Sequence, residues 1–168
     1  MHEFLIFFWK MLLLKSNPED IPESKFLLFL VLGLYFLLNV ITIALVDFFD
    51  KAFLLILLDI LLLIVWVYMV LKIFKMQYRL TQTLIALFGT GIFFQLLSIP
   101  LRLGIEGAQG GLASFSVLGF FIILLWVTMV YGYLISCAIN RSLRVGVLFA
   151  ASYFILSFQL AAQILSVS

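Results

Sequence analysis

Five long apolar runs constrain this chain more than any other feature of its sequence. Each run is continuous and is bounded by charged or turn-forming residues, and together they cover 26–46, 52–71, 80–101, 112–138 and 145–167. A helix needs about 20 residues to cross a hydrocarbon core of about 30 Å. Strands of a membrane barrel would instead show alternating segments of about ten residues. Because backbone amides in lipid need partners within their own segment, the runs predict five transmembrane helices.

Composition supports the same fold class. The chain has 168 residues, of which 66% are hydrophobic and 11% are charged. Soluble domains average about 45–50% apolar and about 25% charged residues, so this chain is suited to lipid. We therefore expect an all-α, polytopic bundle of five helices in residues 26–168. Residues 1–25 are expected to form a separate N-terminal unit, a short helix followed by a polar cytoplasmic linker.

The first fourteen residues are apolar but too short to span a bilayer. Trp9 and Lys10 suit the headgroup depth, where the indole ring lies at the interface and the ammonium reaches water. We predict an interfacial helix on the cytoplasmic side, with docking against the bundle as an equal alternative. The linker that follows contains helix-breaking prolines, and Ser24 can cap the first spanning helix.

The distribution of basic residues predicts the orientation. Eight of the ten fall in segments that share one side of a five-helix bundle, whereas Lys51 and Arg102 fall on the other side. The eight are Lys10, Lys15, Lys25, Lys72, Lys75, Arg79, Arg141 and Arg144. The positive-inside rule then places the N-terminus in the cytoplasm and the C-terminus outside. The glycine-rich segment 102–111 is expected to be a loosely structured external link.

Asp59 is the one acidic residue well inside an apolar run, about ten ångströms from the expected external boundary. A carboxyl group there costs a few kcal/mol, and such residues face a bundle interior or a water-filled path. One interpretation is a proton or cation site. The other is a protonated Asp59 hydrogen-bonded to a neighbouring helix, since no second charge accompanies it within the spans.

Four amide side chains are expected in the same half of the bilayer as Asp59: Asn39, Gln95, Gln159 and Gln163. Each belongs to a stripe of polar residues at helical spacing, so each stripe marks one helix face. Because lipid is a poor neighbour for amides, we expect these faces to converge with Asp59 in the interior. The cluster is either polar glue, worth about 0.6 kcal/mol per contact, or a small cavity that opens outward.

Small residues mark expected helix contacts. Thr128, Gly132 and Ser136 repeat at four-residue spacing, which lets helix backbones approach closely. Gly89 and Gly91 are expected to serve the same purpose in the third span.

Several functional classes are not supported by the sequence. The only histidine is His2, and the single cysteine, Cys137, lies in an apolar run where it is expected to be structural. No nucleophile–base pair, phosphate-binding loop or metal-ligand cluster is present, so we expect no enzyme activity, no cofactor and no metal. The basic residues are scattered, which argues against nucleic-acid binding.

The segment before the third span reads Tyr78-Arg79-Leu80-Thr81-Gln82-Thr83, followed by LIALFGTG. With five spans and a cytoplasmic N-terminus, this chain resembles the Yip-type family of small five-span membrane proteins, in particular its bacterial members. The resemblance covers residue 26 to the C-terminus and implies a location in the inner membrane of a bacterium. In eukaryotes the family is associated with vesicle traffic and small GTPases. The chain holds no Asp-Leu-Tyr-Gly-Pro motif, so GTPase binding is not carried over.

Two functions fit these observations. The first is a non-enzymatic scaffold or accessory protein that contacts lipids, further copies of itself or a larger membrane complex. The second is a small oligomeric transporter or channel with a polar site around Asp59.

Overall fold

The structure, a computed structural model, describes residues 8–16, 18–44, 49–107 and 111–166. The long helices are α2 (Lys25–Ala44), α3 (Phe49–Ile73), α4 (Leu80–Gly107), α5 (Gly111–Ala138) and α6 (Leu143–Ser166). Two single-turn 3-10 helices, η1 (Pro18–Asp20) and η2 (Gln77–Arg79), precede α2 and α4. All five long helices can cross a membrane by length and composition, and the described ranges contain no strand. The all-α prediction is confirmed, and the chain is a multi-pass membrane protein.

α4 is the central helix of the bundle. Every residue from 83 to 91 is buried, and α4 contacts α2, α3 and α5. A helix that is buried on all sides must be surrounded by other elements. α2 and α6 lie at the periphery, where Phe26 and Leu148 are 78% and 70% exposed. These apolar faces are suited to lipid.

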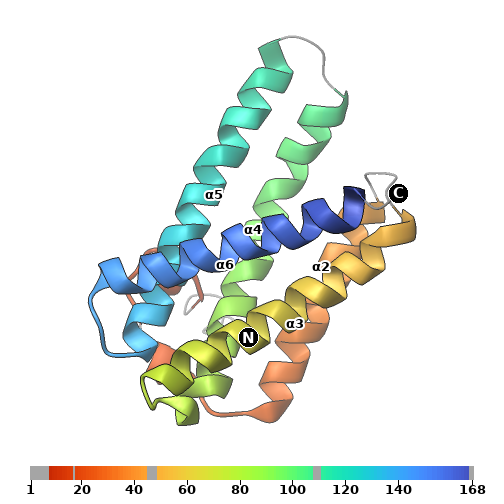
Figure 1. Cartoon of the computed structure of the whole chain (residues 1–168). Coiled ribbons are helices and arrows are strands. Elements are labelled where there is room, and N and C mark those ends of the chain that lie inside the picture. The colour runs from red at the N-terminus through yellow and green to blue at the C-terminus, as the bar shows by residue number, and fades with distance from the viewer. Residues whose placement is uncertain (1–7, 17, 45–48, 108–110, 167–168) are drawn as a thin grey trace.

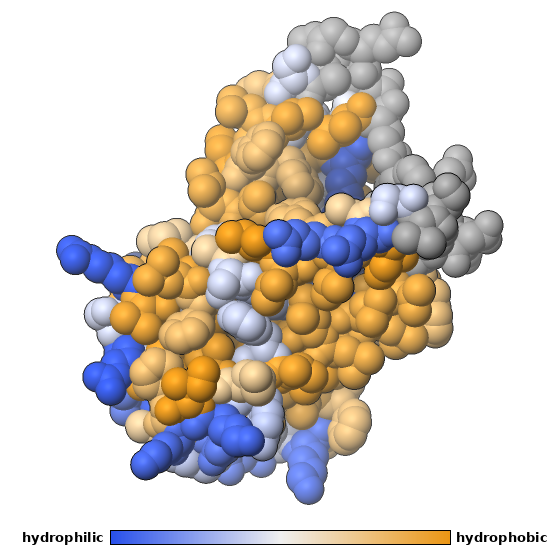
Figure 2. Space-filling view, in the orientation of Figure 1, coloured by the Kyte–Doolittle hydropathy of each residue, from blue (hydrophilic) through white to orange (hydrophobic). Residues whose placement is uncertain are grey.

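The helices converge at one end and diverge at the other (Figure 1). α4 and α5 form an antiparallel hairpin that projects beyond the other helices, while α3 and α6 contact each other and cross it. Each helix of the hairpin has 28 residues and is therefore about 42 Å long. We call the end that carries Lys72, Lys75, Arg79, Arg141 and Arg144 the basic end; Figure 2 shows hydrophilic residues gathered at the lower end of the molecule. The opposite end holds the divergent helix ends.

The prediction of a loose link at 102–111 is wrong for most of that segment. α4 continues through Pro100 to Gly107, and α5 begins at Gly111; residues 108–110 lie outside the described ranges. A proline removes one helical hydrogen bond, which membrane helices tolerate when neighbours surround them. Gly104 lies against Ser116 of α5, so the two helices remain in contact beyond the proline. Arg102 is consequently part of a helix.

α5 and α6 cross at their glycines. A Cβ atom at Gly132 would lie 2.7 Å from the Cα atom of Val147, and one at Gly146 would overlap the Gly132 carbonyl oxygen. Ser136 is buried at the same crossing. Thr128 is half-buried, and its hydroxyl donates to the Leu124 carbonyl at 2.7 Å. The predicted stripe therefore includes a backbone-to-backbone contact.

The N-terminal segment docks against the bundle, which was the alternative to an interfacial helix. Residues 8–12 are helical, and Phe8, Met11 and Leu12 are buried. The Phe8 ring covers Gly89 of α4, and the Trp126 indole donates to the Leu12 carbonyl at 3.2 Å. Gly89 thus makes room for this segment rather than for another spanning helix. His2 lies outside the described residues.

Three helical segments end in the same capping motif, at Leu14, Lys75 and Asn140. These residues have left-handed backbone conformations, with φ of 59°, 59° and 52°. Each donates its N–H to the carbonyl three residues back, at 2.9–3.2 Å. The residue after each donates to the carbonyl five residues back, at 2.8–3.0 Å. This Schellman arrangement satisfies helix carbonyls that otherwise lack partners.

Candidate functional site

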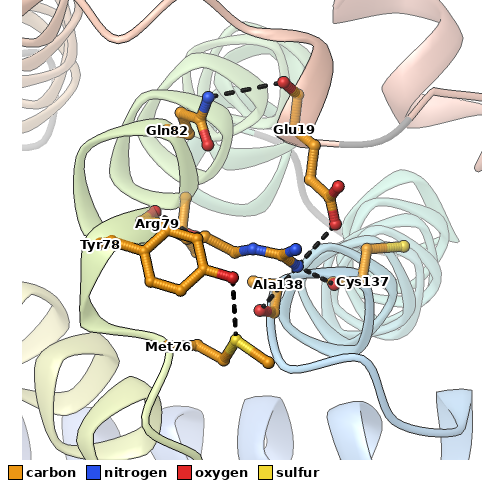
Figure 3. Close-up of polar contacts among 8 residues, drawn as sticks. Glu19, Met76, Tyr78, Arg79, Gln82, Cys137 and Ala138 are labelled. Carbon is orange, nitrogen blue, oxygen red and sulfur yellow. Dashed lines mark hydrogen bonds and ion pairs between the residues drawn. The ribbon is translucent and has the colours of Figure 1, made fainter.

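A polar cluster at the basic end joins three segments of the chain (Figure 3). The Arg79 Nη1 atom lies 2.6 Å from a Glu19 carboxylate oxygen and donates to the carbonyls of Cys137 and Ala138 at 3.3 Å. Gln82 donates to the backbone carbonyls of Ile21 and Glu19 at 3.0 and 3.4 Å. A cation is favourable at a helix C-terminus. These contacts bind the linker to α4 through Gln82, and the linker and η2 to the end of α5 through Arg79. We call Glu19, Arg79 and Gln82 the brace.

Two members of the brace lie in the segment Tyr78–Thr83 that precedes the third span. Besides Arg79 and Gln82, the Thr83 hydroxyl donates to the Arg79 carbonyl at 2.8 Å. The Tyr78 hydroxyl donates to the Met76 sulfur at 3.2 Å (Figure 3). The contacts of Tyr78 and Thr83 are local, whereas Arg79 and Gln82 hold the linker in place.

The second polar cluster surrounds Asp59 on α3. Tyr153 and Ser157 of α6 donate to its Oδ1 atom at 2.7 and 2.8 Å, and Tyr35 of α2 donates to Oδ2 at 3.2 Å. An ionised carboxylate offers about four acceptor positions, so these hydroxyls leave about one, on Oδ2. Asp59 therefore joins α3 to both α2 and α6.

Beside Asp59 lies a cavity of about 260 Å³, which we call the polar hollow. Its polar lining comes from four helices and consists of Tyr35, Asn39, Asp59, Gln95, Arg102 and Ser157. The structure thus brings together Asp59, Asn39 and Gln95, as the stripes predicted. The Asn39 amide also donates to the Tyr35 carbonyl at 2.9 Å on its own helix.

A second cavity of about 200 Å³ shares Tyr35, Gln95, Arg102 and Ser157 with the polar hollow. The rest of its wall is mainly apolar and includes Phe94, Ile123, Leu124, Val127 and Phe158. We call it the apolar hollow. It lies between the α4–α5 hairpin and α6, and Figure 2 shows hydrophilic atoms in the angle between these elements.

Arg102 changes the interpretation of Asp59. From the sequence we expected this arginine in an external link and no second charged side chain near Asp59. Since α4 continues beyond Pro100, the Arg102 side chain lines both hollows, and its guanidinium lies 5.8 Å from the centre of the Phe120 ring. A basic and an acidic side chain therefore share one cavity.

Gln159 and Gln163 do not join the cluster. Both are exposed on α6, and Figure 2 shows a hydrophilic patch over the C-terminal half of that helix. The inward face of α6 carries Tyr153 and Ser157, and Gln159 is two residues, or about 200°, from Ser157. The expected convergence fails for these two because hydroxyl groups occupy the interior face.

Gly91 shapes the site. A Cβ atom there would lie 2.8 Å from the Tyr131 hydroxyl and 2.9 Å from the Tyr35 ring. The Tyr131 hydroxyl donates to the Leu87 carbonyl at 3.1 Å, and Tyr35 donates to Asp59. Gly91 thus gives both tyrosines the room to reach their acceptors.

Comparisons with protein-family models, curated proteins and solved structures give no match for this chain. Among the described residues, no three His, Cys, Asp or Glu side chains gather in a way that could hold a metal ion.

Proposed function

We propose that this protein binds a small charged group in the polar hollow and catalyses no reaction. The observation that carries the proposal is that Asp59 and Arg102 line one cavity inside the bundle. Charged side chains within a membrane are costly, and where they face a cavity they typically mark a binding site or a path. Two amides and three hydroxyls beside them supply further hydrogen-bonding groups.

Accessibility of the polar hollow tests the proposal. Gln95 lines both hollows, whereas Thr90 on the same helix is fully buried. In a Cys137→Ala background, Gln95→Cys should react with a water-soluble maleimide when the protein is purified in detergent and depleted of lipid. Thr90→Cys should react only after denaturation. Failure of Gln95→Cys to react would show that the cavity is closed to water and would contradict a polar binding site.

We further propose that the basic end faces the cytoplasm of a bacterial cell, so that the polar hollow lies in the outer half of the inner membrane. The eight-to-two distribution of basic residues supports this orientation. A periplasm-active reporter should be active when fused after Ser168 and inactive after Lys75. The reverse activities would contradict the orientation. If the protein also transports its ligand, we expect an oligomer, since five spans cannot divide into two equal inverted repeats.

A second candidate function is that of a scaffold or accessory protein, and Gln159 and Gln163 favour it. Both amides are exposed on a spanning helix, where lipid is a poor neighbour and another membrane protein could supply hydrogen bonds. A further copy of this chain or a larger complex would fit, as would the resemblance to the Yip-type family. Wild type should co-purify with a partner or with itself, and Gln159→Leu with Gln163→Leu should not. An isolated wild-type monomer would contradict this function.

A further inference from the structure

We infer that the ligand of the polar hollow is one phospholipid molecule with a primary-amine headgroup. The inference rests on the function proposed above and names the chemistry of its ligand. It depends on three parts of the site: the remaining acceptor position on Asp59, the guanidinium of Arg102, and the apolar hollow that adjoins them.

Asp59 is suited to an ammonium group. Its Oδ1 atom already accepts two hydroxyl hydrogen bonds and its Oδ2 atom accepts one. The position left on Oδ2 can accept one more N–H donor, and a primary ammonium carries three such donors and no acceptor. A quaternary ammonium has no N–H group and could only contribute its charge.

Arg102 is suited to the phosphate. A guanidinium presents five N–H donors in a planar fork that matches phosphate geometry, so it can bind a phosphate and retain other contacts. Arg102 lines both hollows, as does Gln95, whose amide can donate to the ester oxygens between headgroup and chain. The boundary between the hollows therefore has the polarity of the region where a headgroup meets its chains.

The apolar hollow is suited to an acyl chain and opens toward lipid. Phe158 belongs to its wall and is also 54% exposed on the outside of α6. The two hollows measure about 260 and 200 Å³ and share four lining residues. Together they can hold the headgroup and the upper part of one acyl chain, with the rest of the lipid in the surrounding bilayer. A lipid can enter such a site sideways from the bilayer.

Charge selects among lipids. An anionic lipid would satisfy Arg102 but would place a net negative charge beside Asp59. A zwitterionic choline lipid would balance the charges but would leave the Oδ2 position without a donor. A free zwitterion without a chain would leave the apolar hollow unfilled. An ethanolamine-type lipid satisfies all three parts of the site.

The test uses the purified full-length chain and native mass spectrometry. Phosphatidylethanolamine, phosphatidylcholine and phosphatidylglycerol with identical acyl chains are titrated separately, and glycerophosphoethanolamine is titrated as a headgroup without chains. We expect phosphatidylethanolamine to bind about tenfold more tightly than the other two lipids, the effect of about one charge-assisted hydrogen bond. The chainless headgroup should bind at least tenfold more weakly. Equal binding of the three lipids, or equal binding of the chainless headgroup, would overturn the inference.

Variants locate the site. Asp59→Asn should bring phosphatidylethanolamine and phosphatidylcholine to equal affinity, and Arg102→Gln should weaken both by about tenfold. Arg144→Gln, an exposed position at the basic end, is the matched control and should change neither. A preference that survives in folded Asp59→Asn would overturn the assignment. If that variant does not fold, the wild-type lipid comparison decides. If Gln95→Cys reacts with the maleimide but the wild type shows no lipid preference, this inference alone is refuted. If Gln95→Cys does not react, the proposed function is refuted.

Discussion

The basic end and the opposite end of the bundle contain similar polar groups and use them differently. At the basic end, Arg79 and Gln82 bond to an acidic side chain and to backbone carbonyls, and the helices are close together. At the opposite end, Asp59 and Arg102 line a cavity between helices that diverge. Arg79 therefore stabilises the packing of the basic end, whereas Arg102 belongs to a candidate binding site at the opposite end.

The difference arises from helix spacing rather than from residue type. Gly132 and Gly146 bring α5 and α6 into backbone contact in the half of α5 nearer the basic end. Beyond that crossing, the α4–α5 hairpin separates from α6 and the hollows begin. The close crossing therefore lies on the side of the basic end, and both hollows lie beyond it.

The largest expected effect comes from filling the close crossing. Gly132→Leu places a side chain against the backbone of Val147, which cannot move aside as a flexible side chain could. We expect a loss of about 1–3 kcal/mol of stability, measured as the thermal midpoint in detergent. Gly33→Leu is the control, since open space surrounds Gly33 on α2. If both variants melt like the wild type, the crossing does not hold the helices.

Asp59 tests whether the opposite end also contributes to stability. Asp59→Leu removes the acceptor of three hydroxyl groups and should cost about 1–3 kcal/mol. Asp59→Asn should cost much less, because its amide oxygen still accepts and the hydroxyls can turn to accept from its amide nitrogen. Denaturation of the two variants side by side would measure this. An equal loss in both would mean that the negative charge itself holds α2, α3 and α6 together.

Helix number, helix positions and part of the site could be predicted from the sequence. Apolar run length determines where a chain can span lipid, and spacing placed Asn39, Gln95 and Asp59 in one half of the bundle. Arg102 could not be placed, because Pro100 and the glycines after it are typical of a loop. In the structure that segment is helical and packs against α5, with Gly104 against Ser116 and Arg102 against Phe120.

The inward face of α6 was also beyond sequence reasoning. Tyr153 and Ser157 have the same four-residue spacing as Gln159 and Gln163, so spacing alone could not choose between the two faces. Because amides are more polar than hydroxyls, we expected the two glutamines on the inward face, and that expectation was wrong. The face that carries Tyr153 and Ser157 points inward because their hydroxyl groups donate hydrogen bonds to Asp59 on α3.

A smaller effect, of opposite sign, is expected at the helix caps of the basic end. Lys75 is exposed and has a φ of 59°, a conformation that costs a residue with a Cβ about 1 kcal/mol. Lys75→Gly should therefore stabilise the protein by roughly that amount in thermal denaturation. Asn140→Gly should give a smaller gain, because asparagine adopts this conformation more readily. Destabilisation by Lys75→Gly would show that its side chain has a packing role.

The central claim is that polar side chains brace the basic end and line a site at the opposite end. Two glutamines on α4 test it most directly, since Gln82 bonds to the linker carbonyls and Gln95 lines both hollows. The measurement is the thermal midpoint of Gln82→Ala and Gln95→Ala in the same detergent. Gln82→Ala should lose about 1 kcal/mol, a shift of about 2–4 °C, whereas Gln95→Ala should melt like the wild type. A loss in Gln95→Ala equal to or greater than that in Gln82→Ala would contradict the claim.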